Sequence, residues 1–69
     1  MIKVINSKYQ FSKLSFRIYV VQKKINLCFR LREEAIKLGM GNGAAYYLNK
    51  IRNYYRLQIK LLSERLQYE

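Results

Sequence analysis

Polar and apolar residues alternate without interruption in Lys13-Leu14-Ser15-Phe16-Arg17-Ile18-Tyr19-Val20. In an extended chain, alternate side chains point to opposite faces, so the four apolar residues would share one face. Plotted at about 100° per residue, the same four scatter around a helix axis. The alternation therefore predicts a single β-strand over residues 13–20. A lone strand leaves its backbone groups unpaired, so it needs a partner outside its own chain.

Two helices are predicted to follow the strand. From Gln22 to Leu38 the apolar residues cover an arc of about 200° on a helical wheel, wide enough to be buried against more than one neighbour. Gly-Met-Gly-Asn-Gly at residues 39–43 breaks the pattern, with Gly39 ending the first helix and Asn42 capping the second. The second helix runs from Ala44 to about Gln67. It carries a main apolar stripe of Leu48, Ile51, Tyr55, Ile59, Leu62 and Leu66, and a flanking stripe of Tyr47, Tyr54, Leu57, Leu61 and Tyr68.

Length and charge restrict the class of protein. The 69 residues allow one domain, and 14 Lys and Arg against four acids give a net charge of +10. No acidic residue precedes Glu33, so the first half of the chain favours phosphate backbones. We divide the chain into a basic N-terminal arm at residues 1–12 and a single strand-helix-helix domain at residues 13–69, with an extended C-terminal helix.

Catalysis and metal binding are not expected. The chain has one cysteine and no histidine, so neither a zinc site nor a nucleophile–base pair can be assembled, and we expect no cofactor. Cys28 lies on the apolar arc and is expected to be a small core residue. The apolar stretch Ile18 to Val21 is far short of the ~20 residues that span a bilayer. These features predict a cytoplasmic protein that is not an enzyme and has no membrane partner.

The order of strand, helix, glycine-containing turn and helix, over about Lys13 to Tyr55, resembles the ribbon-helix-helix family of DNA-binding proteins. Leu-Arg-Glu-Glu-Ala-Ile-Lys-Leu-Gly-Met at residues 31–40 is also similar to the end of the first helix in that family. The resemblance implies a mostly α protein with one short β-strand that pairs across a homodimer. The two-stranded ribbon would enter the major groove of double-stranded DNA.

The resemblance also implies site residues. The outward positions of the strand would contact bases, and Arg17 can donate two hydrogen bonds to a guanine. These positions are Lys13, Ser15, Arg17 and Tyr19. Phosphate contacts are expected from Lys3, Lys8, Lys23 and Lys24 and from the start of the second helix at Gly41, Asn42 and Gly43. The dimer core would consist of Leu14, Phe16, Ile18, Val20, Leu48, Ile51 and Tyr55.

Two functions follow from these patterns. The first is a sequence-specific DNA-binding protein, such as a small transcriptional regulator or a plasmid or phage accessory factor. The alternative is an all-α two-helix hairpin in which residues 14–38 are mostly helical. Such a hairpin would bind RNA or a protein partner, for example through its C-terminal helix, and would inhibit or scaffold a nucleic-acid complex. An anionic lipid surface is the weakest of the three ligands considered.

Overall fold

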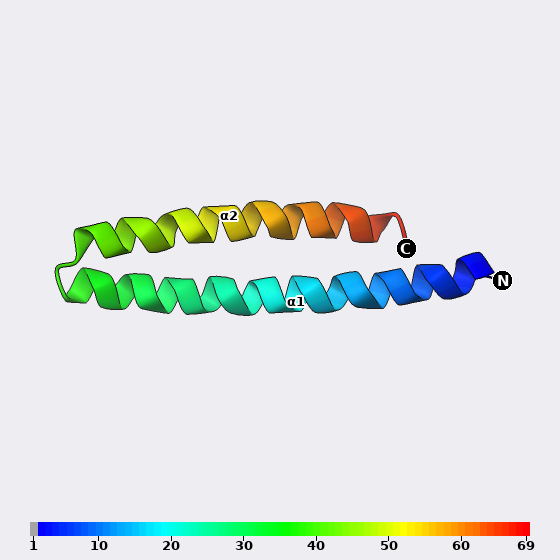
Figure 1. Ribbon diagram of the computed structural model, residues 1–69, viewed down its shortest axis with the longest axis horizontal. Coiled ribbons are helices and arrows are strands. Elements are labelled where there is room, and N and C mark those ends of the chain that lie inside the picture. Colours follow the sequence, from blue (N-terminus) through cyan, green and yellow to red (C-terminus); the bar gives the residue numbers. More distant parts are fainter. Residues whose placement is uncertain (1) are drawn as a thin grey trace.

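The computed structural model is an antiparallel hairpin of two α-helices joined by a short turn (Figure 1). Helix α1 spans Ile2–Lys37 and helix α2 spans Gly41–Leu66. The structure describes the backbone of residues 2–69 and the side chains of residues 7–69. The hairpin is a rod of 57 × 14 × 11 Å. Because α1 has 36 residues and α2 has 26, the N-terminal end of α1 projects beyond the end of α2 (Figure 1).

The predicted strand over residues 13–20 is wrong. All eight residues lie within α1, and none of residues 2–69 is in a strand. The ribbon-helix-helix fold, with strands paired across a homodimer, is therefore wrong as well. The observed fold is the all-α two-helix hairpin, which was the alternative interpretation of the sequence.

A seven-residue repeat explains why this stretch is helical. Core positions in α1 recur at alternating spacings of four and three residues, as in coiled coils. In α1 they are Leu14, Ile18, Val21, Ile25, Cys28, Arg32 and Ala35, and in α2 they are Ala44, Tyr47, Ile51, Tyr54, Gln58, Leu61 and Arg65. Every one of these positions is buried or half-buried. The alternation at residues 13–20 is a coincidence, because Leu14 and Ile18 belong to this repeat whereas Phe16 and Val20 do not.

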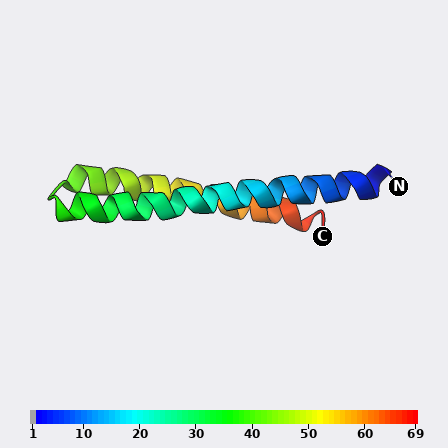
Figure 2. The same cartoon turned by 90° about the horizontal axis from the view of Figure 1, so that it is seen from below.

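The core lies along the line where the two helices meet. Its main cluster contains Leu14, Val21 and Ile25 of α1 and Leu61 of α2, and Ile25 is fully buried. Nearer the turn the contact is made by small residues. A Cβ atom at Gly43 would lie 3.5 Å from the Cβ of Ala35, so the two helices approach closely there. Figure 2 shows the helices crossing at a shallow angle, as expected for a seven-residue repeat.

Cys28 is buried in this core, which confirms the sequence-based prediction.

The turn ends α1 at the predicted glycine. Gly39 has a φ of 72°, a left-handed conformation that residues with a Cβ adopt only at a cost. Its N–H donates to the carbonyl of Ile36 at 3.1 Å, and the N–H of Met40 donates to the carbonyl of Ala35 at 2.8 Å, which together form a Schellman motif. The predicted N-cap at Asn42 is wrong, because α2 begins at Gly41 with Met40 as its N-cap and no side-chain cap bond.

Candidate nucleic-acid interface

Most of the positive charge lies on one lateral surface of the hairpin and on the outer edges of both helices. The seven-residue repeat places nine basic residues there, all exposed except the half-buried Lys50, and we call this surface the basic side. Its basic residues are Lys13, Arg17, Lys23, Lys24, Arg30 and Lys37 of α1 and Lys50, Arg56 and Lys60 of α2. The same positions hold two acids, Glu34 and Glu64, so the basic side has a net charge of +7.

Aromatic rings of α2 hold two of these lysines. The Nζ of Lys24 lies 5.9 Å from the ring centroid of Tyr54, and the Nζ of Lys50 lies 5.1 Å from that of Tyr46. A side-chain hydrogen bond with Tyr46 raises the pKa of Lys50 above its ordinary value. Lysine is protonated at neutral pH at its ordinary pKa, so this shift leaves the charge of Lys50 there unchanged.

A shallow hollow separates the cations of the two helices. Arg17 and Lys24 line its α1 wall, and Leu57 and Leu61 line its α2 wall. The hollow carries positive charge at its rim and apolar side chains at its base.

The four residues predicted to contact bases do not form one surface. In a helix, residues two apart are rotated by about 200°, so Lys13 and Arg17 lie on the basic side and Ser15 and Tyr19 lie on the other. The Oγ of Ser15 accepts a hydrogen bond from Nη1 of Arg65 at 3.2 Å. The ring of Tyr19 lies 5.3 Å from the Nζ of Lys23. Because residues 13–20 are helical, they cannot form the two-stranded ribbon that was predicted to place these four side chains in the major groove.

The predicted phosphate contacts are also divided. Lys23 and Lys24 lie on the basic side, whereas Lys8 is exposed on the opposite lateral surface. Gly41, Asn42 and Gly43 form the first turn of α2, at the end of the rod far from Lys8. The side chain of Lys3 lies outside the described residues, and residues 2–12, predicted as an arm, are the N-terminal end of α1.

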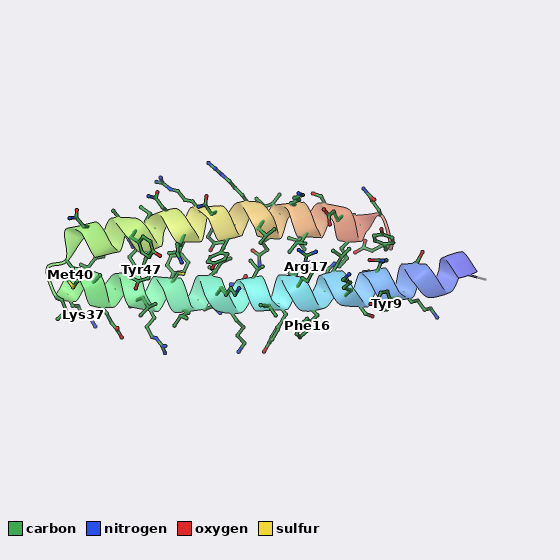
Figure 3. All side chains as sticks on the ribbon, in the orientation of Figure 1. Tyr9, Phe16, Arg17, Lys37, Met40 and Tyr47 are labelled. Carbon is green, nitrogen blue, oxygen red and sulfur yellow. The ribbon has the colours of Figure 1, made fainter. Side chains whose placement is uncertain are left out.

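The predicted dimer core is divided in the same way. Leu14 and Ile51 are buried inside the hairpin, and Ile18 packs against the main core cluster. Val20 and Leu48 are half-buried. Phe16 is 67% exposed and points away from α2 (Figure 3), and Tyr55 is 41% exposed. These seven residues therefore do not form one intermolecular surface.

Sequence reasoning missed five members of the basic side. They are Arg30, Lys37, Lys50, Arg56 and Lys60. The signal that could have found some of them is the repeat itself, because Lys23, Arg30 and Lys37 recur every seven residues and so share one stripe of a helix.

The chain matches no protein-family model, no curated protein and no solved structure. Among the described residues, neither helix has an apolar stretch long enough to cross a membrane.

Proposed function

We propose that the hairpin binds the phosphate backbone of a nucleic-acid duplex through its basic side. The observation that carries this proposal is the segregation of charge. The basic side, which includes the outer edges of both helices, has nine cations and two acids, and five of those cations flank the core on its lateral surface. The opposite lateral surface has no net charge, with Lys8 and Arg52 balanced by Glu33 and Glu69. A surface with a strong field of one sign attracts a polyanion and raises its rate of association.

The length of the basic side supports the same ligand. From Lys13 to Lys37 the cations of α1 extend over about 36 Å, at 1.5 Å per residue. One turn of a DNA duplex rises by about 34–36 Å, so the basic side is long enough to contact the phosphates that face it along one turn.

The mode of binding is contact with phosphates rather than base readout. Lys and Arg side chains on a helical rod can neutralise phosphates of any sequence, whereas sequence discrimination needs side chains placed at base edges. We therefore propose a small basic interaction protein, not an enzyme, that coats or scaffolds a nucleic-acid complex. A cytoplasmic location suits both a nucleic-acid ligand and the free thiol of Cys28.

A pair of matched double variants tests the proposal. Arg17→Gln/Lys24→Gln and Lys8→Gln/Arg52→Gln have the same net charge but remove it from opposite sides. Affinity for a 20-base-pair DNA duplex and for an RNA duplex of equal length is measured by fluorescence anisotropy over a range of salt concentrations. We expect the first variant to reduce the slope of log affinity against log salt by about 1.8, and the second to leave it unchanged.

Three results would contradict the proposal. Equal effects of the two double variants would mean that net charge alone attracts the duplex. Absence of binding to either duplex at 50 mM salt would exclude a nucleic-acid duplex as the ligand. Binding to anionic lipid vesicles without binding to a duplex would assign the basic side to a lipid surface.

A further inference from the structure

The lateral surface opposite the basic side is apolar and exposed. Its large apolar side chains range from 37% exposed at Leu62 to 65% exposed at Leu66. They are Tyr19, Phe29 and Ile36 of α1 and Tyr55, Ile59, Leu62 and Leu66 of α2, and we call this surface the apolar side. The rings of Phe29 and Tyr55, with centroids 6.5 Å apart, join its two halves across the hairpin.

Helix α2 has a second seam on this side. Leu48, Tyr55, Ile59, Leu62 and Leu66 follow spacings of seven, four, three and four residues, which is a continuous coiled-coil repeat with Arg52 in its one polar position. The first seam of α2, at Ile51 and Leu61, is buried against α1. A helix with two apolar seams is suited to a bundle of more than two helices.

The hairpin exposes more surface than a protein of its size normally does. Its accessible surface is 5625 Å² for a mass of 8.4 kDa. A compact monomer of that mass exposes about 4,600 Å², so the excess is about 1,000 Å². The projecting end of α1 contributes part of the excess. The full excess of about 1,000 Å² is of the order that a stable interface removes from each partner, about 800 Å².

We propose that a second copy of this chain covers the apolar side, so that two hairpins form a four-helix bundle in which α2 packs antiparallel against α2 of the second copy. The seam is nearly symmetric about residue 57, as a two-fold axis requires. Leu48 of one copy would face Leu66 of the other, and Tyr55 would face Ile59. Arg52 would face Leu62, and its aliphatic stem can lie along that leucine while the guanidinium reaches water.

Charge also favours a second copy on this side. Each chain has a net charge of +10, so two copies repel each other across most of their surface. The charged residues of the apolar side cancel one another, although the Nζ of Lys23, on the outer edge of α1, lies 5.3 Å from the ring centroid of Tyr19. Packing there leaves the rest of both basic sides on the outside of the bundle. Self-association through the apolar side therefore does not depend on the proposed function of the basic side.

Sedimentation equilibrium at tens of micromolar protein and 150 mM salt tests the interface. We expect the wild-type chain to sediment at twice 8.4 kDa and Ile59→Ser/Leu66→Ser to sediment at 8.4 kDa. The matched control is Phe16→Ser/Leu27→Ser, which removes apolar side chains that are 67% and 45% exposed away from the apolar side. This control should remain dimeric. A monomeric wild-type chain, or a dimer that persists in Ile59→Ser/Leu66→Ser, would overturn the proposal.

Charges placed at Leu62 test the antiparallel register. Leu62→Glu puts a carboxylate opposite Arg52 of the second copy, whereas Leu62→Lys puts a second cation there. We expect the glutamate variant to dimerise at least tenfold more tightly than the lysine variant. Because net charge also differs, both are repeated with Arg52→Leu, which should remove most of the difference. If the glutamate and lysine variants still differ in dimer affinity after Arg52→Leu, this register is contradicted.

Arg52→Leu alone should tighten the wild-type dimer by about tenfold.

Discussion

The two lateral surfaces of the hairpin differ in charge although the same two helices form both. The basic side has nine Lys and Arg residues and a net charge of +7, and the apolar side has no net charge and seven exposed large apolar side chains. The core positions of the repeat are common to both sides. The positions that flank the core on one side carry Lys13, Arg17, Lys24, Lys50 and Lys60 among exposed apolar residues such as Leu27 and Leu57, and those on the other side carry two cations balanced by two acids. In this chain the core repeat therefore determines the fold, and the flanking positions determine what each surface can bind.

The difference between the two sides makes them separable by salt. Attraction between exposed charges is screened within about 10 Å at 0.1 M salt, whereas burial of apolar surface does not weaken as salt is added. Added salt should therefore weaken binding through the basic side, whereas it should not weaken association through the apolar side.

The largest expected effect is on the basic side. If the bound duplex has six to ten phosphates neutralised, affinity should fall by about 10³–10⁵-fold between 50 and 200 mM salt. Over the same range the mass of the dimer should stay constant, since screening reduces the repulsion between two chains of charge +10. Anisotropy titrations and sedimentation of the same samples measure both. A dimer that dissociates as salt rises would show that charge, not apolar burial, holds the two copies together.

The variant Ile59→Ser/Leu66→Ser sharpens this test. It should bind the duplex with a salt slope per chain that is unchanged, because the basic side is intact. Loss of duplex binding in this variant, with its helices preserved by circular dichroism, would show that the basic side acts only in the dimer.

The next effect concerns residues 13–20, which the sequence predicted to be a strand. Leu14 is 5% exposed and Phe16 is 67% exposed, although a strand would place both on one face. Leu14→Ala should lower the free energy of unfolding by about 2–5 kcal/mol, because it leaves a cavity in the core. Phe16→Ala should lower it by less than about 1 kcal/mol. Urea unfolding at a fixed protein concentration measures both. Equal losses would mean that the two side chains share one environment, in contradiction to the hairpin.

Much of the hairpin was predictable from local sequence. Two helices separated by a break near Gly39 appear in the structure, and so does the role of Gly39, but the break is shorter than predicted: α1 ends at Lys37 and α2 begins at Gly41 rather than Ala44. The strand was predicted because eight residues are too few to distinguish two periods. The repeat that begins at Leu14 and Ile18 continues through Val21, Ile25 and Cys28. The repeat continues past Val20, where the predicted strand ended, so it is recognised only in a segment longer than those eight residues.

The choice of buried stripe on α2 could not be predicted from periodicity. The main stripe expected from the sequence is mostly exposed, and the stripe that faces α1 includes the polar residues Gln58 and Arg65. Nε2 of Gln58 donates to Oε1 of Gln22 at 2.7 Å, and Arg65 donates to Ser15 at 3.2 Å. These bonds satisfy polar groups that a pattern assigns to the surface. They depend on the partner helix, so they are visible only in the folded hairpin.

The candidate site shows the same limit. Lys13, Arg17, Lys23 and Lys24 were selected from the sequence and lie on the basic side, and their role as nucleic-acid contacts stays a prediction. Their grouping with Ser15 and Tyr19 assumed a period of two residues, and a helix separates those side chains. The period used to group these residues was therefore wrong, and whether they contact a nucleic acid is still to be tested.

The smallest expected effect concerns the turn, which fixes which sides of α1 and α2 come together. Gly39→Ala should lower the free energy of unfolding by about 1–2 kcal/mol, because alanine is disfavoured at a φ of 72°. Gly41→Ala is the matched control. Position 41 is helical and a Cβ atom there would meet nothing within 4 Å, so alanine should raise the free energy of unfolding by about 0.5 kcal/mol.

Urea unfolding compares the two glycine variants at one protein concentration. Opposite signs are expected because the same substitution meets a left-handed residue at one position and a helical residue two positions later. Neither substitution touches the basic side or the apolar side, so the salt slope and the sedimenting mass should stay at their wild-type values. A change in either property caused by Gly39→Ala would mean that the turn, and not only the core repeat, sets the arrangement of the two sides.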